Sequence, residues 1–434
     1  MKINYLVIFF GLLWAPVFAQ QIVPISKTEV LEKVMQNNHT LKISEQEVLS
    51  AKGDYSQTRA AFLPNITASH TGMATTNPLM AFGFKLNQGI VTQGDFDPNK
   101  LNDPSQLEIF ATKIEVQQPI FNLDGVYQRK AAKAKWRATQ MQLERNGDYI
   151  KLESEKAYMQ LQLAYKNLDV LEVVLKSAKE NLRLTKNRFE QGYLQQADVL
   201  MVEVRVTEIE NQLQYAKSNI LNASEYLALL MDEKLEALLK PTDALKVASN
   251  LITSEGLSAN RSDIKAMEFA LEAYKEGYNA EKMTFLPRLN AFGSYELYDD
   301  QIFQADADGY LFGASLTWNL LEGSKRFGKT QKSKAEYNKA NLQLEQYKSE
   351  SSIEVKKAKR MYEDTKNNLK LTQLALEQSR EALRIRTNRF KEGLEKTSDL
   401  LMAETQVAQK ELEYFNTIFE HNYALAYLQF LTKN

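Results

Sequence analysis

The most specific chemical pattern in the chain is the segment 323–330, GSKRFGKT, which fits the phosphate-binding motif G-x-x-x-x-G-K-T. A true motif of this kind follows a buried parallel strand, which is apolar on both faces. The preceding segment, Tyr310–Leu321, instead alternates between apolar and polar residues, and no such pattern follows Gly125 at the matching place in the first half. We therefore interpret the match as chance and expect neither nucleotide nor any other cofactor.

Other catalytic and metal-binding chemistry has little support. The histidines His39, His70 and His421 share no ligand spacing, and the absence of cysteine excludes thiol catalysis, thiolate metal sites and disulfides. Ser262 and Lys265 match S-x-x-K without the companion motifs of a serine acyl-enzyme. The 54 basic and 55 acidic residues balance, so nucleic acid is not an expected partner. We expect no catalytic residues, no metal and no enzyme activity.

Two acidic residues, Asp198 and Asp399, stand at equivalent places in an internal repeat. Residues 187–192 (NRFEQG) return as residues 388–393 (NRFKEG), an offset of 201 that also relates the two aspartates. Glycine at the end of a helix supplies a left-handed conformation, and aspartate suits the start of the next helix. The repeat therefore predicts a helix–turn–helix at Gly192 and another at Gly393, in which capping is the simplest role for the acids.

The elements that position these turns are long helices. Proline is absent between residues 120 and 240 and after 287, and apolar residues recur there at three- and four-residue spacing. Such spacing buries a narrow seam against a partner helix, as in coiled coils. A helix over residues 126–188 would be about 95 Å long. We expect each repeat to end in a long helical hairpin.

Each repeat also holds two strand-like segments, near Ile66–Met73 and Phe110–Gln117 in the first and at Leu289–Tyr298 and Tyr310–Leu321 in the second. Their length and alternation are typical of transmembrane β-strands, although a soluble two-sided sheet is the alternative. In hydrocarbon a sheet must close on itself, and known barrels need eight or more strands. Four strands cannot close, so several chains must each contribute a sheet.

The beginning of the chain has the pattern of an export signal. Lys2 precedes an apolar run, and Val17 and Ala19 are small residues at the two positions that a signal peptidase recognises. We predict four regions: a signal peptide over 1–19, a first repeat over 20–231, a linker over 232–260 and a second repeat over 261–434.

At this point the sequence resembles the TolC-like outer-membrane efflux protein family over nearly the whole mature chain. The resemblance rests on the segments 30–38 (VLEKVMQNN) and 59–64 (RAAFLP), and on the duplicated pattern R-F-x-x-G followed by D-[VL]-L at 188–200 and 389–401. It implies a mainly α fold of coiled-coil hairpins with four transmembrane strands per chain. It further implies a homotrimer forming an α/β-barrel tunnel with twelve strands, and a location in the outer membrane of a Gram-negative bacterium with a large periplasmic part.

The same resemblance assigns roles to the turns. In the family they form periplasmic tips, where the tunnel narrows and a periplasmic adaptor binds. It implies adaptor docking at Phe189, Gly192, Phe390 and Gly393, and we predict that Gln195, Asp198, Glu395 and Asp399 hold or line the pore entrance. Alternation adds an aromatic girdle at the lipid interface, with ordinary sheet packing as the alternative; its members are Tyr295, Tyr298, Tyr310, Phe312 and Trp318.

The expected function is the outer-membrane channel of a tripartite efflux or type I secretion system. It would be a passive exit duct, supplied by an inner-membrane pump of unknown class through the adaptor and embedded in outer-membrane lipid. The alternative is a periplasmic or surface coiled-coil structural protein, and an enzyme is a more distant one.

Overall fold

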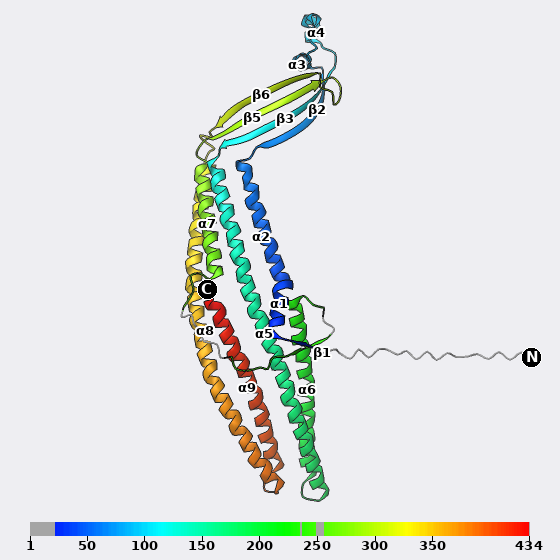
Figure 1. Cartoon of the computed structure of the whole chain (residues 1–434), viewed down its shortest axis with the longest axis vertical. Coiled ribbons are helices and arrows are strands. Elements are labelled where there is room, and N and C mark those ends of the chain that lie inside the picture. Colours follow the sequence, from blue (N-terminus) through cyan, green and yellow to red (C-terminus); the bar gives the residue numbers. More distant parts are fainter. Residues whose placement is uncertain (1–21, 235–236, 249–255, 434) are drawn as a thin grey trace, which may run out of the picture. The chain divides into compact units, whose positions relative to one another are not determined.

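The computed structural model describes residues 22–234, 237–248 and 256–433, so the predicted signal peptide 1–19 lies outside the described residues, as does part of the predicted linker (Figure 1). The elements are, in chain order, β1 (Ile22–Ile25), α1 (Lys27–Asn37), α2 (His39–Gln57), η1 (Thr58–Ala61), β2 (Asn65–Thr75), α3 (Pro78–Asn87), η2 (Gln93–Phe96), α4 (Pro98–Asn102), β3 (Leu107–Phe121), α5 (Leu123–Glu190), α6 (Gln196–Met231), β4 (Leu238–Pro241), α7 (Ser262–Met283), β5 (Arg288–Asp299), β6 (Ala307–Thr317), α8 (Lys325–Lys391) and α9 (Thr397–Thr432).

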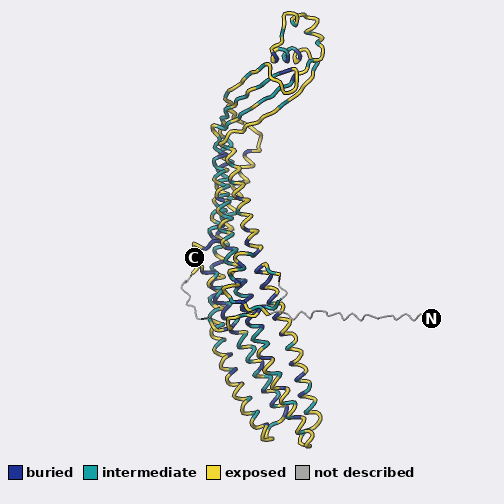
Figure 2. The backbone as a smooth tube through the Cα atoms, turned by 45° about the vertical axis from the view of Figure 1, so that its right-hand side comes forward, coloured by how far each residue is buried: buried dark blue, intermediate teal, exposed yellow. Residues whose placement is uncertain are grey.

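The long helices predicted from the absence of proline are confirmed. The helix expected over 126–188 is α5, whose 68 residues correspond to about 100 Å at a rise of about 1.5 Å per residue. The predicted seam is buried, as the dark segments of Figure 2 indicate, and it includes Leu161, Ala178, Val202, Ile209 and Leu227. Heptad spacing therefore reports real packing between α5 and α6.

The four predicted strands are present, but one was placed too far along the chain. The segment expected as Tyr310–Leu321 forms β6 only as far as Thr317. After that point the Trp318 indole nitrogen donates to the Phe285 carbonyl oxygen at 2.9 Å, and Arg326 donates to the Asn319 carbonyl oxygen. These bonds turn the backbone toward α8, and Gly323 follows with a φ of +58°. The alternation of apolar and polar residues continues past the end of the strand to Leu321, because a turn made by such bonds does not interrupt it.

The described residues form two compact units. The first comprises residues up to Ile43 together with 145–258 and 350–434, and the second comprises 44–144 and 259–349. Helices α5 and α8 contribute residues to both. The order helix, strand, strand, helix, helix occurs twice, as α2-β2-β3-α5-α6 and as α7-β5-β6-α8-α9. Because each compact unit takes residues from both halves, the sequential division at 232–260 remains a prediction.

In the first unit a small parallel strand pair is fixed to the helices by buried tyrosines. Strand β1 pairs with β4 in the register Ile22–Leu238 to Ile25–Pro241. The Tyr158 hydroxyl, on α5, donates to the Ile25 carbonyl oxygen at 3.1 Å or to Asp243 Oδ2 at 2.9 Å, and burial raises the pKa of Tyr158 to about 12. The hydroxyl therefore stays protonated and serves as a donor throughout the physiological pH range.

We expect Tyr158→Phe to destabilise this unit by about 1–3 kcal/mol, because Tyr158 is only 1% exposed and the change removes a buried hydrogen bond to the Ile25 carbonyl oxygen or to the charged Asp243 carboxylate. Thermal unfolding followed by circular dichroism measures the change. Tyr165→Phe is the matched control: its hydroxyl makes one bond, to the Leu239 carbonyl oxygen, from a half-buried position. Equal losses from the two variants would contradict the assignment.

The second unit contains an antiparallel sheet in the order β2-β3-β5-β6. Its helices pack locally through aromatic and charged contacts: the Tyr55 ring stacks on Trp136 at 5.7 Å, and the Arg129 guanidinium lies 4.2 Å from the Tyr55 ring. Among the described residues, no helix combines the length and the apolar character that crossing a membrane requires.

Candidate functional site

The two hairpin turns have the same backbone geometry. Gly192 and Gly393 have φ values of +80° and +76°, which side chains other than glycine rarely adopt. In each turn the glycine N–H bonds the carbonyl oxygen three residues earlier, at 2.9 and 3.0 Å. The next N–H bonds the carbonyl oxygen five residues earlier, at 2.9 Å in both turns. The duplicated glycines thus end α5 and α8 in the same way, as the repeat predicted.

The predicted entrance residues of the first turn belong to the start of α6. Gln195 precedes the helix, and its backbone N–H donates to Asp198 Oδ2 at 3.1 Å. A carboxylate at this position satisfies an amide that has no partner within the helix and interacts favourably with the helix dipole. Asp198 therefore has the capping role expected from the sequence, while Gln195 stays exposed.

The predicted entrance residues of the second turn differ from each other. Asp399 is half-buried in the first turn of α9, three residues after the N-cap Lys396. Glu395 is held by two arginines of α8: Arg386 Nη1 lies 2.7 Å from Oε1, and Arg389 Nε lies 2.9 Å from Oε2. The Glu395 side chain is only 10% exposed. The charge of Glu395 is therefore neutralised within the turn by these two arginines. Of the two carboxylates, Asp399 is the one without an ion pair among the described residues.

The two turns contact each other through Arg188. Its Nη2 atom donates to the Lys391 carbonyl oxygen at 3.0 Å, and its guanidinium lies 4.5 Å from the centre of the Phe390 ring. Phe390 is buried at 2% exposure, whereas its repeat partner Phe189 is 41% exposed. The two phenylalanines, equivalent in sequence, are not equivalent in structure.

The sequence reasoning missed the arginines. Arg188 and Arg389 were visible as a duplicated pair, which could have suggested a role, but one bridges the two turns and the other binds Glu395. Arg386 had no signal, because its repeat counterpart is Thr185 and the counterpart of Glu395 is Leu194.

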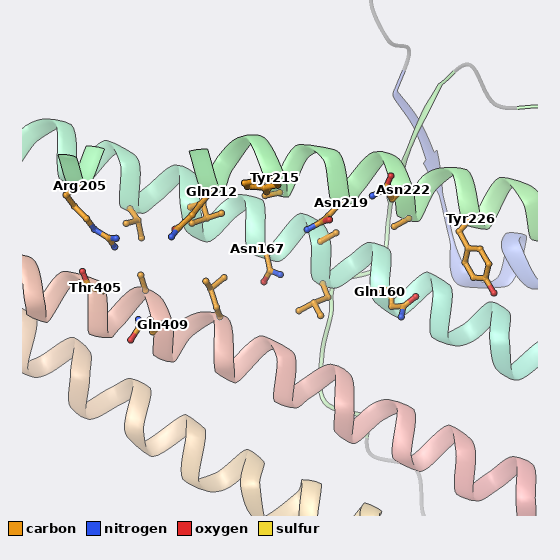
Figure 3. A pocket seen from close by; sticks show the side chains of 18 residues that line it. Gln160, Asn167, Arg205, Gln212, Tyr215, Asn219, Asn222, Tyr226, Thr405 and Gln409 are labelled. Atoms are coloured by element: carbon orange, nitrogen blue, oxygen red, sulfur yellow. The ribbon is translucent and has the colours of Figure 1, made fainter. Parts of the chain in front are cut away.

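Above the turns, a groove of about 670 Å³ separates the hairpin α5–α6 from α9 (Figure 3). Amide side chains point into it from all three helices, and Arg205 lies at one end. The amides are Gln160, Asn167, Gln212, Asn219, Asn222 and Gln409. At the level of the groove, the hairpin α5–α6 and α9 therefore do not pack closely against each other.

The sheet of the second unit has one apolar and one mostly polar face. The register pairs Ile66 with Val116, Ile114 with Tyr295, and Tyr295 with Tyr310, which places these residues on one face. Phe312 and Leu316 continue that face along β6, and both are exposed. The opposite face carries Lys113, whose Nζ atom lies 3.0 Å from Glu115 Oε2 and 3.3 Å from Glu296 Oε1.

Of the five residues predicted as an aromatic girdle, the sheet brings three together on its apolar face: Tyr295, Tyr310 and Phe312. Tyr298 is on the polar face, where its hydroxyl donates to Glu296 Oε2 at 2.5 Å. Trp318 follows the end of β6 and is 57% exposed. Residues 295 and 298 differ by an odd number, so Tyr295 and Tyr298 lie on opposite faces of β5.

The phosphate-binding pattern at 323–330 does not form the corresponding loop. It follows an antiparallel strand, and its Gly328, Lys329 and Thr330 lie within the first turns of α8. The Thr330 hydroxyl donates to the Arg326 carbonyl oxygen at 2.9 Å, within that helix. The structure thus gives this segment the role of a basic strand-to-helix junction.

Long hairpins with glycine turns, together with a four-stranded sheet that is apolar on one face, define the class of TolC-like outer-membrane channels. Sequence comparison identifies the family. The profile described as "Outer membrane efflux protein" matches residues 30–232 and 254–428, well over half of the chain, so the chain belongs to the outer membrane efflux protein family.

Solved structures have the same fold at low sequence identity. The CmeC outer membrane channel of Campylobacter jejuni gives a TM-score of 0.79 at 15% identity, over 94% of this chain and 85% of that one. The outer membrane protein VceC of Vibrio cholerae gives 0.77 at 18% identity, over 94% and 96%. The open state of the MtrE outer membrane channel of Neisseria gonorrhoeae gives 0.78 at 17%, over 94% and 88%. No curated protein sequence matches the chain significantly.

Family membership establishes the general function. The protein is an efflux channel of the outer membrane. Channels of this family work with adaptors and inner-membrane pumps, and the family is one of passive channels.

Proposed function

We propose that three copies of the chain form a passive exit duct, whose outer-membrane part is a twelve-stranded barrel and whose periplasmic part is a ring of hairpins. The observation that carries the proposal is the sheet β2-β3-β5-β6, which is apolar on one face and ends in two unpaired edge strands, β2 and β6. Unpaired backbone groups cost several kcal/mol each in hydrocarbon, so the edges need partners. Three copies of four strands make twelve, with β6 of one copy beside β2 of the next.

The outer helices of the hairpins support closure by copies of the same chain. On α6, exposed Leu200, Val204 and Leu229 fall within a sector of about 40°, on the side away from the buried seam. On α8, exposed Ile353, Leu371, Leu374 and Ile385 fall within a similar sector of about 60°. A helix with two opposite apolar seams is suited to a ring, in which it contacts a neighbour on each side. We infer that α6 of one copy packs on α8 of the next.

The hairpin turns would form the entrance, where the duct meets its partners. Phe189 and Tyr193 are exposed beside Gly192, and Leu394 is exposed beside Gly393. Exposed apolar residues at the end of a charged hairpin suit docking to a periplasmic adaptor. Gln195, Asp198, Glu395 and Asp399 would hold or line the entrance, with Asp399 as the charge that faces the passage. Energy would come from an inner-membrane pump, which delivers cargo through the adaptor.

Lipid would contact the apolar face of the sheet. Four aromatic residues would lie near the boundary between lipid and water: Tyr295, Tyr310, Phe312 and Trp318. Tyrosine and tryptophan prefer that boundary because their rings combine an apolar body with a polar atom. Tyr298 is excluded from this girdle, since it shares the polar face with Glu296.

Single-channel recording of Asp399→Ala in planar bilayers tests the entrance. Threefold symmetry places three Asp399 carboxylates near the axis, and like charges there favour cations. We expect the variant to lose part of the cation preference, so that its reversal potential in a salt gradient moves toward zero. Glu363→Ala, an exposed acidic residue on α8, is the control and should leave selectivity unchanged. Unchanged conductance and selectivity in Asp399→Ala would contradict the role of Asp399.

A further inference from the structure

Between the turns and the groove, the carboxyl of Glu404 joins the two hairpins. The equivalent residue of the other repeat does not have this role. Asn181 Nδ2 on α5 donates to Glu404 Oε1 on α9, so the bond links the first hairpin to the second. From α6, Arg205 acts on the same carboxyl at longer range, although its guanidinium also donates to Glu208 Oε2 at 3.4 Å. The Arg205 side chain is only 14% exposed and points from α6 toward α9 (Figure 3).

Comparison of the repeats shows how this bridge arises. At an offset of 201, Glu404 corresponds to Glu203, and Glu203 pairs within its own hairpin with Lys186 at 2.7 Å. The position that corresponds to Lys186 is Thr387, whose hydroxyl donates instead to the Leu383 carbonyl oxygen at 2.8 Å. Without a lysine in its own hairpin, Glu404 reaches across to a neutral amide.

The surrounding charges leave Glu404 with little compensation. On α5 the residue that faces it is neutral Asn181, and the nearby cation Lys186 is bonded to Glu203. On α8 the cations Arg386 and Arg389 are bonded to Glu395, and Arg380 is bonded to Glu411. Arg205 is shared with Glu208. An ionised carboxylate that is partly buried beside an amide and one shared guanidinium is less stable than the same group in water.

We propose that Glu404 is a proton-dependent latch between the hairpins: with its carboxyl protonated the hairpins stay packed at this level, and its ionisation loosens them. The proposal rests on the proposed role of the hairpin turns as the duct entrance.

The direction of the pH dependence follows from burial. Burial raises the pKa of Glu404, and the Asn181 hydrogen bond and the Arg205 charge oppose that rise only in part. A carboxyl whose pKa is raised in the packed state stabilises that state at acid pH, and the stabilisation is lost as pH rises through the raised pKa. The hairpins should therefore lie closer at acid pH than at neutral pH.

The test is the distance between spin labels on the two turns of the full mature protein, measured by pulsed electron resonance at about pH 5 and about pH 8. The chain has no cysteine, so Gln191→Cys and Glu392→Cys, both at exposed positions, introduce the only labels. We expect the shortest distance to lengthen at the higher pH. Glu404→Gln, which cannot ionise, should keep the short distance at both pH values, while the repeat control Glu203→Gln should still show the shift.

A second variant tests the same idea without removing the carboxyl. Thr387→Lys gives Glu404 the partner that Glu203 has, so the long distance should appear at both pH values. The latch is refuted if the unmodified label pair shows no shift between the two pH values, or if Glu404→Gln retains the shift. Because the distances do not depend on conduction, a protein that shifts but carries no current would refute the duct and leave the latch standing.

Discussion

Replacing both Leu371 and Leu374 with glutamate should separate the proposed trimer into single chains. These leucines are 66% and 50% exposed on α8, and they lie on the sector proposed to pack against α6 of the next copy. Burying a leucine contributes about 1.5–3 kcal/mol, and burying a carboxylate without a partner costs several kcal/mol more. Each interface should therefore weaken by more than about a thousandfold, since about 1.4 kcal/mol is tenfold.

Sedimentation in detergent measures the loss, and stepwise conductance in planar bilayers should disappear with it. The control is Lys370→Glu with Gln373→Glu, which adds more negative charge in the same two turns but on a different side of α8. Both control residues are exposed, so the control should remain trimeric. A stable, conducting trimer of the leucine variant would show that α8 does not form the interface.

Ile114→Arg should prevent stable insertion of the sheet into the outer membrane. Ile114 lies near the middle of β3 on the apolar face, opposite Tyr295 of β5. Arginine on the lipid face costs about 2–4 kcal/mol at the middle of a bilayer and less toward its boundaries, and three copies of the chain would carry three arginines. We expect the amount of folded protein in outer-membrane fractions to fall strongly, and unfolding in lipid vesicles to require less denaturant.

Ser294→Arg is the matched control for that substitution. Ser294 adjoins Tyr295 on β5 at the same level of the sheet, but it lies on the polar face opposite Glu115, a favourable partner for arginine. This variant should insert normally and should alter only the ion preference of the passage. If the two arginines were equally tolerated, the apolar face would not be the one that contacts lipid.

The helices and strands could be predicted because their patterns are local. Apolar spacing placed α5 within three residues at each end, and the offset of 201 located both glycine turns. The end of β6 was wrong because a turn stabilised by bonds from Trp318 and Arg326 leaves the alternation of residues unchanged. Tyr298 follows Tyr295 by three residues, so the period of two in β5 places these two predicted girdle residues on opposite faces.

The side-chain partners at the turns could not be predicted, since they depend on how separate helices approach. Glu395 binds Arg386 and Arg389, at separations of nine and six residues across a turn, which no helical period selects. Arg188 reaches Lys391, a residue 203 positions away. The repeat predicted equivalent surroundings for Phe189 and Phe390, which is wrong. Only Phe390 is buried and has the guanidinium of Arg188 over its ring.

The positions at which the two repeats differ show how the two hairpins contact each other. The first hairpin contains the ion pair Lys186–Glu203. The second hairpin has Thr387 in place of the lysine, and its Glu404 accepts a hydrogen bond from the first hairpin instead. The pairs Glu180–Arg183 and Glu381–Arg384 are by contrast duplicated with the same spacing and the same 2.7 Å contact. The ion pairs that occur in both repeats stabilise each hairpin in the same way. An ion pair that occurs in only one repeat, as Lys186–Glu203 does, marks a position where the other repeat contacts the opposite hairpin.

The most direct test of the whole interpretation is the native mass of the mature protein extracted from outer membranes. A wall built from three copies predicts one detergent-bound species of three chains, which precipitates when detergent is withdrawn because its apolar sheet face is left uncovered. A single chain that remains dissolved in buffer without detergent would contradict it, since four strands with two open edges cannot line a passage through lipid on their own.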